Sequence, residues 1–166
     1  MPFFVAWTDD LNEDAFLAFH RGARETWSPE RWSCHFVTFL RGHAIGTQAI
    51  EAEGFAKERT VDTGSWLGAP FQGQGYGFEQ RAAVLEFAFK GLGARAATSG
   101  ALEHNIASQR ISEKLGYRFT GTHEVAPRGE PVRHLDYRIE RDEWRCPIPV
   151  ELEGLEPALP LFGITP

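Results

Sequence analysis

The sequence has little cysteine, and its two thiols form no recognisable site. Cys34 and Cys146 have no C-x-x-C partner and no histidine at metal-binding spacing. We therefore expect buried thiols rather than ligands or a disulfide. The six histidines show no ligand spacing, and His123-Glu124 lacks the second histidine of a zinc-protease helix. The sequence predicts no metal site.

An excess of positive charge and long apolar runs are also missing. The 166 residues carry a net charge of −6, which gives no sign of nucleic-acid binding. The sequence shows no signal peptide and no apolar run of membrane length. We therefore expect a cytoplasmic protein that binds neither nucleic acid nor a membrane. Internal repeats are absent, and the length predicts one domain with its own core.

The most informative feature is the glycine-rich stretch Gln72–Gly77, which reads Q-G-Q-G-Y-G. It lies between a strand-like apolar run over residues 61–67 and a helical pattern over residues 78–90. Alternate glycines let a phosphate approach the backbone, and the N-terminus of the following helix favours an anion. A Walker loop would end in G-K-S or G-K-T, and a Rossmann fingerprint spaces its glycines differently. The stretch predicts a phosphate-binding turn, with a plain tight loop as the alternative.

The rest of the pattern predicts a mixture of helices and strands. Asp10 is a candidate N-cap for a helix over residues 11–27. A further helix is expected over residues 105–115, and strands over 35–40, 44–51, 61–67, 95–99, 117–125 and 132–139. We expect an α/β (α+β) domain over residues 1–145. Residues 146–166 form a proline-rich extension in which helix is not expected, and which packs on the surface or against a partner.

Two segments together resemble the GNAT (GCN5-related) family of acyl-CoA-dependent N-acyltransferases. They are Q-G-Q-G-Y-G at residues 72–77 and N-x-A-S-x-x-x-x-E-K-L-G-Y at residues 105–117. The similarity spans about residues 33–145, and the RimJ/RimL-like branch, which modifies protein or peptide amines, is nearest. Residues 63–68, 81–85, 97–99 and 160–163 are similar to an actinobacterial subgroup that includes a succinyl-CoA-using transferase. The resemblance implies a mixed, mostly antiparallel central sheet flanked by helices.

The resemblance also reveals a difference at the N-terminus. The family usually has a strand and a helix before the region where Leu11 lies, whereas only residues 1–7 precede it here. The first strand is then missing, replaced by residues 3–7, or supplied by another chain. The last of these alternatives would make the protein a homo-oligomer.

The resemblance implies that acetyl-CoA or succinyl-CoA is the acyl donor. Its pantetheine arm would pair with the backbone of the strand before the glycine-rich stretch, where a main-chain N–H would also serve the oxyanion. Instead of contacting CoA, the side chains of Trp66 and Leu67 could belong to the core. Lys114 could instead lie on a solvated helix surface. The residues implied for CoA are Ser65, Trp66, Leu67, Gln72, Gly73, Gln74, Gly75, Tyr76, Gly77, Asn105, Ser108 and Lys114, the last at the 3′-phosphate.

Ser108 is the candidate acid for the departing thiolate. It lies three residues after Asn105, so both side chains share one helix face. In the RimL-like branch a serine at this place protonates the sulfur. Asn105 is expected to cap the helix and, by the resemblance, to bind the pantetheine or the incoming group. Tyr117, at the start of a strand, looks like a core residue.

The general base is not carried over from the resemblance. The branch uses a glutamate in the closing hairpin, and the matching stretch here is Ala126-Pro127-Arg128. An amine is largely protonated at neutral pH, so a carboxylate would help to activate it. Asp62, in the strand next to the cofactor, is the first candidate, ahead of Glu124 and Glu130.

The predicted reaction is direct transfer of an acetyl or succinyl group to a primary amine in a ternary complex. A covalent acyl-enzyme is not expected, because the sequence has neither a nucleophile elbow nor a Cys–His pairing. A succinyl carboxylate would need a cation or other hydrogen-bond donor, and Arg24, Arg31 and His35 are candidates. The alternatives are a non-catalytic acyl-CoA-binding regulatory protein and, less compatible with the loop, a nucleotide-binding enzyme.

Overall fold

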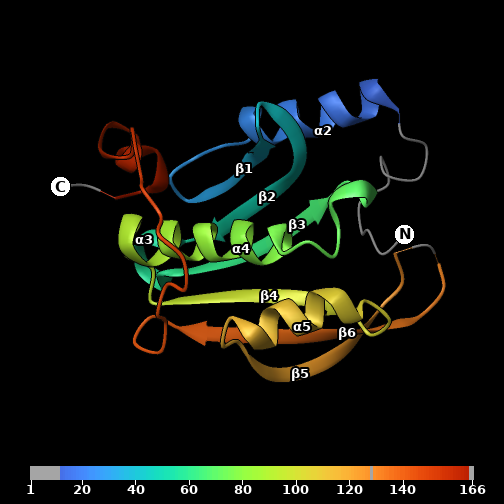
Figure 1. Ribbon diagram of the computed structural model, residues 1–166. Coiled ribbons are helices and arrows are strands. Elements are labelled where there is room, and N and C mark those ends of the chain that lie inside the picture. Colours follow the sequence, from blue (N-terminus) through green and yellow to red (C-terminus); the bar gives the residue numbers. More distant parts are fainter. Residues whose placement is uncertain (1–11, 128, 165–166) are drawn as a thin grey trace.

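The computed structural model describes residues 12–127 and 129–164, which form one mixed six-stranded sheet with helices against it (Figure 1). The strand order is β1-β2-β3-β4-β6-β5, and every neighbouring pair is antiparallel except β3 and β4. The predicted mixed, mostly antiparallel sheet is therefore confirmed. The strands are β1 (Arg31–Leu40), β2 (His43–Glu53), β3 (Thr60–Leu67), β4 (Ala96–Leu102), β5 (Arg118–Val125) and β6 (Val132–Glu140).

The helices agree with the predicted pattern within a few residues. The predicted helix over residues 78–90 divides into an α-helix that begins at Tyr76 and a π-helical turn that follows Glu86. The helices are α2 (Glu13–Glu25), α3 (Phe55–Glu58), η1 (Ala69–Phe71), α4 (Tyr76–Glu86), η2 (Phe87–Gly91), α5 (Ile106–Lys114) and η3 (Glu156–Phe162).

The first described helix begins with an asparagine cap. The Asn12 side-chain oxygen accepts from the N–H groups of Asp14 at 2.9 Å and Ala15 at 3.3 Å, which satisfies two donors that have no partner within a helix. This bond makes Asn12 the N-cap in place of Asp10, which lies outside the described residues. The predictions for a first strand at residues 1–7 also fall outside them.

The main core lies between the sheet and helices α4 and α5, which cross the same face of the sheet (Figure 1). Val61 of β3, Leu85 of α4, Ala97 of β4 and Ile139 of β6 have almost no exposed surface. Gly77 allows the two helices to approach, because a Cβ there would lie only 3.1 Å from Ile111 of α5. This packing fixes α5 beside the N-terminal half of α4.

The C-terminal segment packs into the same core. Phe162 is 5% exposed, and its ring centroid lies 5.3 Å from Trp27 and 4.9 Å from Trp32. The Trp27 Nε1–H also donates to the Leu161 carbonyl at 2.8 Å. No helix was expected in this segment, but residues Glu156–Phe162 form the short 3₁₀ helix η3. This helix has a proline in its first turn, where the missing N–H does no harm.

Cys34 and Cys146 are free and partly buried, and burial raises the pKa of Cys34 to about 11. Among the described residues, every helix is too short or too polar to cross a membrane.

Candidate active site

Strands β3 and β4 separate halfway along their length. They pair in parallel only from Thr60↔Ala96 to Thr63↔Ser99, although β3 continues to Leu67 and β4 to Leu102. Beyond that point the facing edges of the two strands no longer bond each other, and backbone groups of this kind need other partners. A cavity of about 660 Å³ lies at this separation and is lined by residues of both strands.

The cavity is open to both faces of the sheet. Side chains alternate along a strand, and Ser65 of β3 lies on the face that carries α4, where it meets Arg81. Asp62, an odd number of residues away, lies on the opposite face, together with His35 of β1. The rings of His20 in α2 and His35 lie 4.8 Å apart. We call these the α4 face and the α2 face; both contribute residues to the one cavity.

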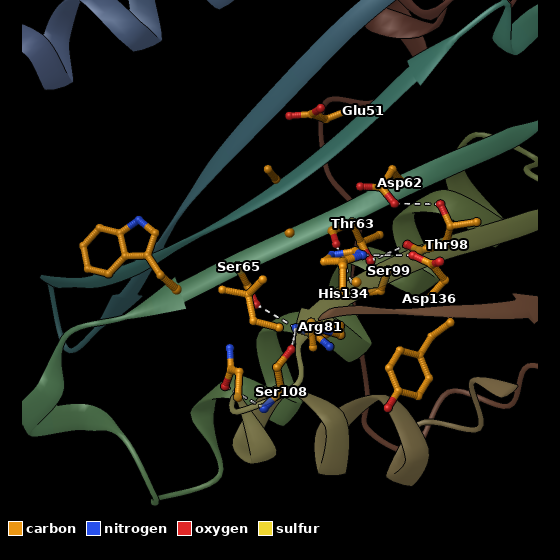
Figure 2. Close-up of a pocket in the computed structure, with 18 of the residues that line it drawn as sticks. Glu51, Asp62, Thr63, Ser65, Arg81, Thr98, Ser99, Ser108, His134 and Asp136 are labelled. Carbon is orange, nitrogen blue, oxygen red and sulfur yellow. Dashed lines mark hydrogen bonds and ion pairs between the residues drawn. The ribbon is translucent and has the colours of Figure 1, made fainter. Parts of the chain in front are cut away.

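On the α4 face the N-terminus of α5 points its first turn at the cavity. Asn105 caps the helix as predicted, because its side-chain oxygen accepts from the Ser108 N–H at 3.3 Å. The Ser108 hydroxyl lies 3.3 Å from an Arg81 nitrogen, and the Ser65 hydroxyl lies 3.1 Å from the same atom (Figure 2). Tyr117 is buried as predicted, with its pKa raised to about 12 by burial.

On the α2 face Asp62 is held by a residue of β4. Its Oδ1 atom accepts from the Thr98 hydroxyl at 2.7 Å (Figure 2). The residue is exposed toward the cavity, yet nearby protein atoms limit the hydration of its carboxyl group. This desolvation raises the pKa of Asp62, the nearby charge of Glu51 raises it further, and the bond from Thr98 opposes both.

Glu51 lies beside Asp62, because the two residues are opposite each other in the β2–β3 ladder. Its carboxylate accepts from the Ser33 hydroxyl at 2.8 Å and lies 3.8 Å from His35. The interaction with the His35 ring is the largest influence and, against the effect of burial, lowers the pKa of Glu51. Two neighbouring carboxyl groups therefore have pKa values displaced in opposite directions, which is typical of catalytic sites.

A hydrogen-bonded group on β5 and β6 completes the α2 face. The Asp136 carboxylate lies 2.9 Å from the Nδ1 atoms of both His123 and His134. Burial pushes the pKa of Asp136 upward, but the two histidines outweigh it and keep the pKa below its usual value. The three residues offer ligand atoms within 4.8 Å of one another, and their mutual hydrogen bonds already satisfy the carboxylate.

The position of His134 depends on a glycine. Gly100 of β4 lies beneath the His134 ring, and a Cβ atom at this residue would overlap the imidazole. Both residues line the cavity beyond the point where β3 and β4 separate. The sequence interpretation missed this group, because it depends on the pairing of three strands.

The glycine-rich stretch forms the turn before α4. Gly73 and Gly75 have φ angles of +73° and +95°, which other residues rarely adopt. The amides of Gln72 and Gln74 donate to the carbonyl groups of Leu67 at 2.9 Å and Pro70 at 2.7 Å. The two glutamine side chains therefore hold the turn in place. The N–H groups of Gln72, Phe78 and Glu79 already donate to backbone carbonyls, so the N–H groups of residues 73–77 are the ones that suit an anion.

The predicted site residues divide between the cavity and its surroundings. Of the candidates for the succinyl carboxylate, His35 lines the cavity, whereas Arg24 and Arg31 lie outside its lining. Glu124 and Glu130 also lie outside it. Lys114 is exposed, with its Nζ 4.4 Å from the Phe78 ring. The residues from the predicted catalytic and CoA set that line the cavity are Asp62, Ser65, Trp66, Asn105 and Ser108, whereas Leu67 and the glycine-rich stretch lie outside it.

Solved structures share this fold. Mycobacterium smegmatis RimJ, in complex with CoA-disulfide, matches with a TM-score of 0.71 at 19% identity, over 86% of this chain and 69% of that chain. The ribosomal-protein-S5-alanine acetyltransferase from Vibrio fischeri matches with a TM-score of 0.65 at 16% identity, over 80% and 72%. A variant of the spermidine N-acetyltransferase SpeG from Vibrio cholerae gives 0.62 at 17% identity, over 81% and 76%.

The sequence itself matches a family model. The model is described as an acetyltransferase (GNAT) domain, and it covers residues 2–118, which is more than half of the chain. The match includes the glycine-rich stretch, α4, both separating strands and α5. This chain therefore belongs to the GNAT acetyltransferase family.

Proposed function

We propose that this protein transfers an acyl group from acyl-CoA to a primary amine by direct attack in a ternary complex. The observation that carries the proposal is the cavity at the separation of β3 and β4, with Ser108 on its α4 face and Asp62 on its α2 face. A thioester in the gap would have a hydroxyl group on one side and a carboxylate on the other. The two proton transfers of acyl transfer can then take place on opposite faces of the sheet.

Three parts of the structure suit the pantetheine arm, the pyrophosphate and the 3′-phosphate of the acyl-CoA donor. The edge of β3 beyond Thr63, which no longer pairs with β4, suits pairing with the pantetheine amides. The turn at Gly73 and Gly75 and the N-terminus of α4 suit the pyrophosphate, and Asn105 lines the cavity beside Ser108. Lys114 remains a candidate for the 3′-phosphate, since its side chain is exposed at the end of α5.

Asp62 would accept the proton of the attacking amine. Glu51 and Asp62 together make this part of the α2 face acidic, which attracts an ammonium group. The raised pKa of Asp62 brings its basicity closer to that of a useful general base. The amine nitrogen attacks the thioester carbonyl carbon, the C–S bond breaks as the C–N bond forms, and Ser108 gives a proton to the departing sulfur.

The donor is acetyl-CoA or, by the resemblance of residues 63–68 and 81–85 to a subgroup, succinyl-CoA. His35 is the candidate that lines the cavity and could donate to a succinyl carboxylate. The acceptor is a primary amine of a protein, peptide or small molecule. The ribosomal-protein-S5-alanine acetyltransferase and the spermidine N-acetyltransferase among the similar structures make an alanine peptide and a polyamine the first two acceptors to test.

Release of free thiol from acetyl-CoA and succinyl-CoA tests the proposal. The acceptors would be an N-terminal alanine peptide, a lysine peptide and spermidine. Turnover with intersecting initial-rate lines is expected, whereas parallel lines would indicate an acyl-enzyme. CoA binding without thiol release for any amine would favour the alternative, a non-catalytic acyl-CoA-binding regulator.

A further inference from the structure

Arg81 is a buried cation at the wall of the cavity. It comes from the second turn of α4, is only 3% exposed, and lies between β3 and α5 (Figure 2). One terminal nitrogen donates to Ser112 at 2.9 Å, and the other donates to Ser65 at 3.1 Å and Ser108 at 3.3 Å. Its Nε–H is buried and finds no acceptor among the described residues.

The charge of Arg81 has no ion-pair partner in the part of the chain that the structure describes. The titratable groups that interact with it are Tyr117, whose hydroxyl bonds Thr63, and Asp62 on the other face of the sheet. Burial lowers the pKa of the guanidinium, but arginine remains protonated in proteins. A buried charge that meets only hydroxyl groups is costly, and an anion brought into the cavity would compensate it.

The bonding pattern also fixes the direction of two hydroxyl protons. A guanidinium can only donate hydrogen bonds, so the oxygens of Ser65 and Ser108 must act as acceptors toward Arg81. Each hydroxyl proton then points away from the guanidinium. Both serines line the cavity, and their protons are available to a group that enters it.

We propose that Arg81 is a positioning residue for the leaving thiolate. It holds Ser108 as a hydrogen-bond donor toward the sulfur, and its charge stabilises the anion that forms when the C–S bond breaks. The electron pair of that bond moves to sulfur, sulfur takes the Ser108 proton, and Ser108 regains a proton from water while Asp62 releases the amine proton to solvent. This inference rests on the proposed function, since it requires the CoA sulfur to lie near Ser108.

The pKa of the CoA thiol in the bound state is the measurement that tests the role. Ultraviolet absorbance of the thiolate would be followed against pH for CoA bound to the unmodified protein and to Arg81→Met. Free CoA titrated in the same buffer gives the reference pKa, and we expect a lower value in the unmodified complex. In Arg81→Met the thiolate fraction at neutral pH should fall at least about tenfold, with kcat reduced and the Kd for CoA nearly unchanged.

Two further variants separate positioning from structural support. Ser112→Ala removes a buried bond to Arg81 but lies outside the cavity lining, so it should lower the melting temperature without moving the thiol titration. Arg81→Lys keeps the charge but cannot bridge both serines, so kcat should fall at least about tenfold and the thiol pKa should rise less than in Arg81→Met. If Arg81→Met does not fold, Arg81→Lys provides the test.

Failure of the Arg81 role and failure of the proposed function would give different results. A thiol titration and kcat that stay at their original values in Arg81→Lys, or in a folded, CoA-binding Arg81→Met, would overturn the role of Arg81 and leave the acyltransferase proposal intact. If the unmodified protein does not bind CoA, the proposed function and this inference fail together.

Discussion

The Thr98 hydroxyl donates a 2.7 Å hydrogen bond to Asp62 from β4 to β3, one residue before the two strands stop pairing. The bond stabilises the carboxylate and so lowers a pKa that burial raises. A base works when deprotonated, so kcat/KM should increase as pH rises through this pKa, above the ordinary value of about 3.9 for an aspartate. Thr98→Val should move this ascending limb to higher pH, whereas Thr98→Ser should leave it in place.

Comparing the pH profiles of an Asp62 variant and a His134 variant would identify the general base. Asp62→Asn should abolish the ascending limb and lower kcat/KM by about 10²–10⁴-fold. His134→Gln changes another titratable side chain that lines the cavity on the α2 face and should retain the limb. A limb that survives Asp62→Asn and disappears in His134→Gln would transfer the role to the histidine.

Gly75 offers a test of the phosphate-binding turn. Gly75→Val should reduce CoA affinity at least about tenfold, because the side chain blocks phosphate approach and its φ of +95° is unfavourable for valine. Calorimetry with CoA and thermal unfolding would separate the two effects. Gly154→Val is the matched control, since Gly154 has a φ of +69° and open space around it in the C-terminal segment.

Such backbone strain costs roughly 1–3 kcal/mol, so both variants should melt at lower temperature, but only Gly75→Val should lose CoA. Unchanged CoA affinity in Gly75→Val would remove the turn from the donor site.

Ser108→Ala should lower kcat by about 10²–10⁴-fold while the Kd for CoA changes little, because the proton matters only as the thiolate leaves. The helix cap should survive, since Asn105 accepts from the backbone N–H of residue 108. Single-turnover kinetics would establish that chemistry is being measured. A normal rate for the chemical step in Ser108→Ala would exclude the serine as the acid.

His35 tests the choice of acyl group. If succinyl-CoA is preferred, His35→Gln should remove the preference in kcat/KM and leave acetyl transfer unchanged. Arg24→Gln, outside the cavity lining, should keep the preference. Equal or better use of acetyl-CoA by the unmodified protein would leave the acyltransferase assignment without its succinyl extension.

Much of this fold could be predicted from signals that lie within a few adjacent residues. The strand before Gln72, the helix after Gly77 and the Asn105 cap each depend on a few adjacent residues, and each was predicted within a few positions. Asn12 was missed because Asp10 offers the same capping chemistry two residues earlier, and only the fold distinguishes between them.

Parts of the site that depend on long-range pairing could not be predicted. His123 meets His134 and Asp136 only through the register of β5 and β6, and Asp62 meets Thr98 only through the parallel pairing of β3 and β4. Arg81 follows a helical pattern in which an arginine normally reaches solvent. Its burial required the close approach of α5, to which Gly77 contributes.

Gly100 places a constraint on how this sequence can diverge. It belongs to neither segment by which the chain resembles its family, and it is only partly buried, yet any side chain there would displace the His134 ring. A side chain at residue 100 therefore requires a change at His134, whereas His134 can change while Gly100 stays. Related chains that carry both residues should share the shape of this wall, even where their overall identity is low.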